Sequence, residues 1–137
     1  LLDNLISKAL ENPRKLFLLD GLGAILSAIL IGMVLVKFEG FIGIPVSTLY
    51  FLARIPIFFA IYDFYSYRQP SQKTGPLLQG IALLNLGYCL VSAGLLFHHL
   101  ETITLIGWGY FLIEILIVLS LAWVEFRVGK RIKKAIK

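Results

Sequence analysis

The chain has 137 residues, of which 58% are hydrophobic and only 15% are charged, and its formal net charge is +5. Soluble domains average about 45–50% apolar and about 25% charged residues, so this composition excludes an ordinary soluble protein and indicates an integral membrane protein. The length leaves no room for a soluble catalytic domain beside several membrane spans, and the single cysteine, Cys89, excludes an internal disulfide.

The first predicted element is a short amphipathic helix within residues 1–13. Apolar residues recur at helical spacing from Leu2 to Leu10, and Pro13 ends the pattern. We expect this helix to lie in the membrane interface. A secretory signal peptide is the alternative, but its basic leading residues and small-residue cleavage site are missing from this segment.

Four apolar stretches follow, over about 16–36, 44–66, 76–98 and 103–126. Each has roughly 20 or more residues, which is enough for a helix to cross about 30 Å of hydrocarbon. A β-barrel would need short alternating segments instead. Because the connections are short, we predict an all-α, up-down-up-down four-helix bundle over 14–127, with a basic tail over 128–137.

Most lysine and arginine residues lie on one side of the predicted spans: before the first, between the second and third, and after the fourth. The positive-inside rule then places both termini in the cytoplasm. We expect the bilayer itself to be a partner, with anionic lipids contacting the basic tail. Nucleic acid is not an expected partner, because the tail lacks interleaved aromatic residues.

Three polar residues fall near the middle of three different spans: Arg54, Asn85 and Glu114. A charge at that depth costs at least about 2.5–3.5 kcal/mol, so each is expected to face the interior. We predict an Arg54–Glu114 ion pair that Asn85 helps to satisfy. Tyr88 and Tyr110 lie on the same helical stripes as Asn85 and Glu114 and complete a predicted binding or transport seam. The alternative is that these groups only fix helix packing.

A second acidic group, Asp20, Asp63 and Glu125, lies toward the cytoplasmic end of the first, second and fourth spans. Three carboxylates at one mouth can collect cations or relay protons. The alternative is that each pairs with a nearby basic residue at the interface. The basic residues in question are Arg14, Lys15, Arg68 and Arg127.

Signals of catalysis are weak. The chain has no glycine-rich phosphate loop, no HExxH motif and no recognisable nucleophile–base pair, so an enzyme is the least favoured class. His98 and His99 precede Glu101, but adjacent helical side chains point about 100° apart and rarely chelate one ion together. We therefore expect no metal site there and no cofactor.

Three runs resemble a group of small bacterial four-helix membrane proteins to which no activity is assigned. These runs are Phe17–Ala24, Asn85–Cys89 and Gly109–Glu114, and the similarity extends from the first span to the fourth. The resemblance implies a multi-pass protein of the bacterial inner membrane and implies no catalytic residue.

Two functions follow as hypotheses from these patterns. The first is an oligomeric protein, expected to be a dimer, that binds or moves a small solute or a proton through the polar seam. A second copy is invoked because four spans enclose little volume. The alternative is a non-catalytic accessory or structural subunit of a membrane complex, in which the buried polar groups fix the fold.

Overall fold

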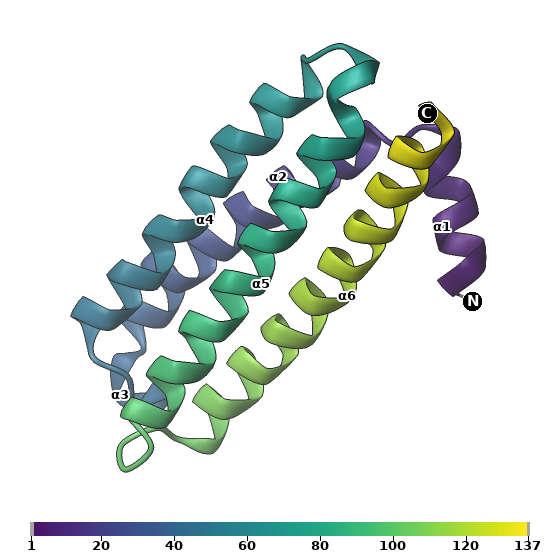
Figure 1. The fold of residues 1–137 in the computed structure, drawn as a ribbon. Coiled ribbons are helices and arrows are strands. Elements are labelled where there is room, and N and C mark those ends of the chain that lie inside the picture. The colour runs from purple at the N-terminus through teal and green to yellow at the C-terminus, as the bar shows by residue number, and fades with distance from the viewer. Residues whose placement is uncertain (1, 137) are drawn as a thin grey trace.

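The computed structural model describes residues 2–136, and every element within that range is helical (Figure 1). In chain order these elements are α1 (Leu2–Glu11), α2 (Lys15–Ile29), the π-helical segment η1 (Leu30–Leu35), α3 (Glu39–Ile42), α4 (Val46–Tyr67), the 3₁₀ segment η2 (Ser71–Lys73), α5 (Thr74–His98) and α6 (Leu105–Ile136).

Four of these stretches are long and apolar enough to cross a membrane: Lys15–Leu35, Val46–Tyr67, Ser71–His98 and Leu105–Lys134. Their most apolar windows have mean hydropathies of 2.2, 1.3, 1.9 and 2.1. The prediction of an all-helical chain with four long apolar helices is therefore confirmed. Helix α6 continues through the basic residues that follow its apolar part, so the described part of the predicted tail is helical.

The four long helices lie side by side, with α2 packed against α4 and α5 packed against α6 (Figure 1). Contacts between α4 and α5 join the two pairs. Buried apolar side chains form two clusters, one around Ile31, Leu49 and Phe111 and the other around Phe17 and Leu78. Helix α1 adds Ile6 to the second cluster and contacts α6.

Helices α5 and α6 approach closely at a pair of glycines, Gly75 and Gly129. A Cβ atom on Gly129 would lie 2.7 Å from the carbonyl oxygen of Gly75, which is closer than real Cβ atoms come. At the other end of the bundle, Gly43 has a φ of 83°, a conformation that suits glycine alone. A Cβ there would lie 2.0 Å from the Thr102 carbonyl oxygen. These glycines let the helices and loops meet backbone to backbone.

The outward faces of the long helices are apolar. Large side chains such as Leu22, Phe58, Leu90 and Leu116 are each more than 60% exposed, and they come from α2, α4, α5 and α6. Four acidic side chains within the long helices show the opposite arrangement, since Asp20, Asp63, Glu114 and Glu125 are buried. An apolar exterior around buried carboxyls is the reverse of a soluble protein's arrangement.

Candidate functional site

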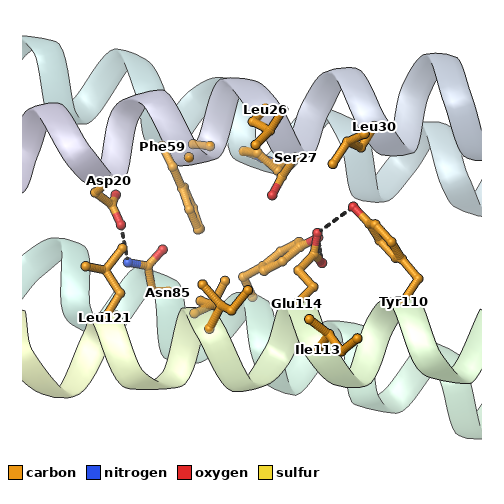
Figure 2. A pocket seen from close by; sticks show the side chains of 16 residues that line it. Asp20, Leu26, Ser27, Leu30, Phe59, Asn85, Tyr110, Ile113, Glu114 and Leu121 are labelled. Atoms are coloured by element: carbon orange, nitrogen blue, oxygen red, sulfur yellow. Dashed lines mark hydrogen bonds between the residues drawn. The ribbon is translucent and has the colours of Figure 1, made fainter.

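A cavity of about 310 Å³ lies between α2 and α6 and is closed on its inner side by α4 and α5 (Figure 2). Most of its wall is apolar, with Leu26, Leu30, Phe59 and Ile113 among the lining side chains. Polar groups are few and come from three helices: Asp20, Ser27, Asn85, Tyr88, Tyr110 and Glu114. A mostly apolar cavity with a few polar groups is the usual composition of a small-molecule site.

Glu114 is the polar centre of this cavity. Its side chain is only 7% exposed, and both of its carboxyl oxygens accept hydrogen bonds. The Tyr88 hydroxyl donates to Oε1 at 2.7 Å. The Tyr110 hydroxyl donates to Oε2 at 3.0 Å (Figure 2). Two fixed donors hold the carboxyl in one orientation and stabilise negative charge on it.

Helical spacing explains how this arrangement forms. Tyr110 lies one turn before Glu114 on α6, so the two side chains share a face and meet directly. Tyr88 lies across the interface on α5, one turn after Asn85. Across the cavity, Ser27 on α2 points toward Glu114 from the opposite wall (Figure 2). The π-helical segment begins at Leu30, and such segments often occur beside functional sites.

A second polar group occupies the end of the cavity nearer the start of α2. Asn85 donates from Nδ2 to Asp20 Oδ1 at 2.8 Å and to Glu125 Oε1 at 3.0 Å. Asp63 from α4 completes the group. The three acids predicted for one mouth therefore lie together, and Asn85 belongs to their group rather than to that of Glu114.

The predicted Arg54–Glu114 ion pair is wrong. Arg54 is exposed on the outer face of α4, and the two tyrosines already occupy both oxygens of Glu114. The physical reason is helical phase. Residues three, four and seven positions after Arg54 are Ile57, Phe58 and Ile61, and all three are exposed, whereas Pro56 and Asp63 define the buried face.

The alternative prediction, in which each of the three acids pairs with a basic residue, also differs from the structure. Asp63 has no hydrogen-bond partner on either oxygen. Arg14 instead donates from Nε to the backbone oxygen of Tyr67 at 3.0 Å, and Arg127 lies over the Trp123 ring. Because the acids point inward, basic side chains at the helix ends do not reach them.

One other sequence feature, His99, has a plain structural role. The Nε2 atom of His99 lies 3.2 Å from Thr48 Oγ1, an interaction that ties α4 to the end of α5.

Sequence reasoning did not identify Phe59 or Gly23 as residues that line the cavity. The position of these residues along their helices does not predict that they line a cavity, because only the packing of the helices shows which residues face it.

Over residues 2–136, the fold and site together define a helical bundle with four helices long enough to cross a membrane and a cavity between them that contains a buried carboxyl. No protein-family model, curated protein or solved structure matches the chain. What the site does must therefore be argued from its own chemistry.

Proposed function

We propose that the four long helices insert into a membrane as an up-down-up-down bundle with both termini in the cytoplasm. The apolar outer faces support insertion, because lipid tails match them and water does not. Short connections between the long helices support alternating directions. Excess lysine and arginine near the termini and in the α4–α5 connection support the orientation, and the resemblance noted above favours a bacterial inner membrane.

Within that membrane, we propose that the protein binds and moves a small cationic solute, or a proton, through the cavity. The observation that carries this proposal is Glu114, a buried carboxyl on the cavity wall held by two tyrosine hydroxyls. A carboxylate attracts a cation, and aromatic faces add a further attraction for quaternary ammonium groups. The cavity supplies such faces from Phe59, Tyr88 and Tyr110.

The cavity also contains a second set of polar groups, at a different depth from Glu114, that a moving solute or proton could contact. Asp20 and Asn85 line it at the end away from Tyr110, so polar groups occur at two depths along one cavity (Figure 2). Ionisable residues inside membrane spans are expensive and commonly mark ion or proton pathways. A path through these groups passes from the three acids to Asn85, Tyr88 and Glu114.

The experiment is a flux assay on purified protein in liposomes, with protons and tetraethylammonium as the probes. Wild-type protein is expected to carry one of these probes, and Glu114→Gln is expected to abolish that flux because the amide keeps the shape but loses the charge. Glu101→Gln is the matched control, since Glu101 is an exposed acid on the α5–α6 connection. Absence of flux from well-folded wild-type protein would contradict the proposal.

A second copy of the chain and anionic lipids are the proposed partners. Helices α2 and α6 flank the cavity with exposed apolar side chains, so a second copy could close its open side. Lys130, Arg131, Lys133 and Lys134 are exposed at the end of α6, and each basic residue near an anionic surface adds about 1 kcal/mol of attraction. Chemical crosslinking in liposomes with and without anionic lipid tests both proposals.

An accessory subunit is the second candidate function, and one observation favours it. Arg54 is exposed eight residues into α4, roughly 12 Å along the helix at 1.5 Å per residue, on a face that lipid would otherwise cover. A partner subunit with an intramembrane acid would satisfy this charge. If Arg54→Gln removes a co-purifying protein while Glu114→Gln leaves it bound, the accessory function is favoured over transport.

A further inference from the structure

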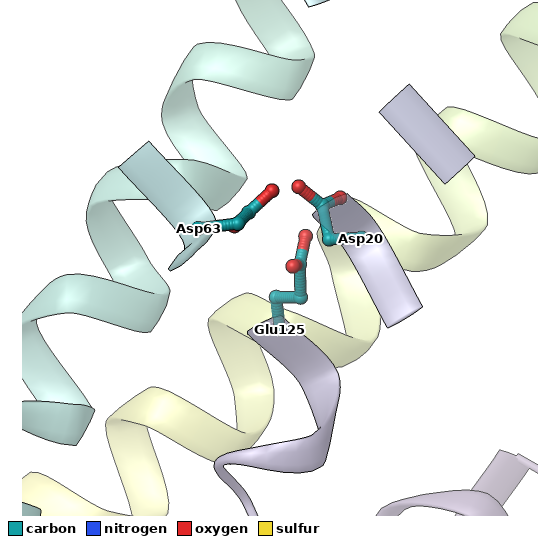
Figure 3. Close-up of side chains that lie close together, drawn as sticks. All are labelled: Asp20, Asp63 and Glu125. Carbon is teal, nitrogen blue, oxygen red and sulfur yellow. The ribbon is translucent and has the colours of Figure 1, made fainter. Parts of the chain in front are cut away.

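Three carboxylates converge between α2, α4 and α6, at the end of the cavity away from Tyr110. Asp20, Asp63 and Glu125 each offer one oxygen, and these oxygens all lie within 4.8 Å of one another. Asp20 is 4% exposed, and the other two are fully buried. Figure 3 shows the three carboxyl groups pointing toward a common centre.

Asn85 fixes two of these acids in place. Its Nδ2 group donates one hydrogen to Asp20 and the other to Glu125, so one oxygen of each acid is held as an acceptor. Each acid still keeps one buried oxygen, Asp20 Oδ2 and Glu125 Oε2, without a hydrogen-bond partner. The asparagine therefore organises the pair and leaves acceptor atoms free.

Asp63 provides an independent observation that points to a ligand. It is fully buried, neither of its oxygens has a hydrogen-bond partner, and its side chain points at the Asp20–Glu125 pair from a separate helix (Figure 3). Buried polar groups in folded proteins nearly always have partners, so a buried carboxyl with two unpartnered oxygens calls for a missing one. In total, four unpartnered carboxyl oxygens belong to this group.

The backbone permits this convergence at one specific residue. Gly21 follows Asp20, and a Cβ atom on Gly21 would lie 3.2 Å from the Cβ atom of Asp63. Such a contact is tighter than nine in ten real Cβ contacts, so a larger residue would force α2 and α4 to shift by a few tenths of an ångström. The glycine brings Asp20 and Asp63 together although like charges repel each other.

We propose that Asp20, Asp63 and Glu125 form a binding site for one divalent metal cation. An all-oxygen set of carboxylates matches the hard cations Mg²⁺, Ca²⁺ and Mn²⁺, and no soft ligand is present among these three side chains. The three oxygens lie within 4.8 Å of one another, which is twice a Ca–O bond of about 2.4 Å. One ion can therefore contact all three.

A divalent cation there would neutralise two of the three negative charges and join three helices at one point. Asp63 lies four residues before the end of α4, about 6 Å along the helix, which is close to the aqueous end of the bundle. A metal ion therefore enters from that end. The metal site and the proposed transport can fail separately, because Glu114, on which transport depends, is not one of the metal ligands.

The test uses the full chain in detergent after treatment with EDTA, and the probes are the metals alone. Electron paramagnetic resonance with Mn²⁺ is expected to show one bound ion per chain at or below about 1 mM, the weak end of protein Ca²⁺ sites. Thermal unfolding is expected to shift upward with the logarithm of metal concentration, because the metal binds the folded state. No bound Mn²⁺ at that concentration overturns the proposal, as does an equal shift with NaCl of the same ionic strength.

Substitutions locate the bound ion. Asp63→Asn keeps the side-chain shape and removes one charge, so it is expected to lose Mn²⁺ binding while the metal-free protein unfolds at the same temperature or higher. Glu125→Gln is a second variant in case the first does not fold. Glu114→Gln is the matched control, a buried acid outside this group that is expected to keep full binding. Unchanged Mn²⁺ binding in Asp63→Asn overturns the proposal.

Discussion

A substitution that fills the cavity tests most directly whether the cavity binds a solute or is only a packing defect. Gly23 is the best position for such a substitution. Gly23 lies on the cavity wall, and a Cβ atom built there meets nothing within 4 Å. The variant Gly23→Leu adds four carbon atoms, each taking up roughly the 30 Å³ of a water molecule. The added side chain has a volume of about 120 Å³, compared with about 310 Å³ for the cavity whose wall Gly23 lines.

The expected result is a loss of function without a loss of stability. Replacing a helical glycine by leucine gains up to about 0.8–1 kcal/mol of helix propensity, so the melting temperature in detergent is expected to stay level or rise. Overpacking a solute into the smaller cavity costs about 1–3 kcal/mol, which corresponds to a fall in flux of about 5-fold to 150-fold.

Gly87→Leu is the matched control for this experiment. Gly87 lies within α5, a Cβ atom there also meets nothing within 4 Å, and the residue does not line the cavity. This variant is expected to gain the same helix propensity and to keep wild-type flux in liposomes. Wild-type flux in Gly23→Leu, or equal loss in both variants, would refute a solute path through the cavity.

Three further predictions concern the contacts that build the site and the fold. Tyr88→Phe removes the hydroxyl that donates to Glu114 at 2.7 Å and is expected to cost about 1–3 kcal/mol in detergent unfolding; an unchanged midpoint would contradict this. Gly129→Ala forces a Cβ atom against the Gly75 carbonyl oxygen, so a net loss of about 1–3 kcal/mol is expected, and a higher melting temperature would disprove the close approach. Ile6→Ala empties a fully buried position, so hydrogen exchange is expected to accelerate in α1 alone, and acceleration throughout α2 would count against a local effect.

The sequence predicted best those features that depend only on position along the chain. The helical class and the four long apolar helices follow from the length and apolarity of each stretch, because a span needs about 20 residues to cross hydrocarbon. Depth along a helix also follows from counting residues at 1.5 Å each. On this basis we expected three acids, Asp20, Asp63 and Glu125, near one mouth. In the structure, one carboxyl oxygen from each lies within 4.8 Å of the others.

The same reasoning failed where direction around the helix axis matters. Arg54 and Glu114 fall at similar depths, but Arg54 faces outward with Ile57 and Phe58 while Glu114 faces the cavity. In α4, apolar residues cover both the buried and the exposed face, so hydropathy gives no sign of which face points inward. A soluble amphipathic helix would have revealed its inner face through its polar side.

The sequence by itself determined that this chain is helical, how long its apolar segments are, and at what depth each polar residue lies. Only the tertiary structure decided that the two tyrosines, and not Arg54, contact Glu114, and that Asn85 contacts Asp20 and Glu125. The physical reason is that chain length fixes position along a helix axis, whereas the rotation of each helix is set by packing against its neighbours, through close approaches such as that at Gly21.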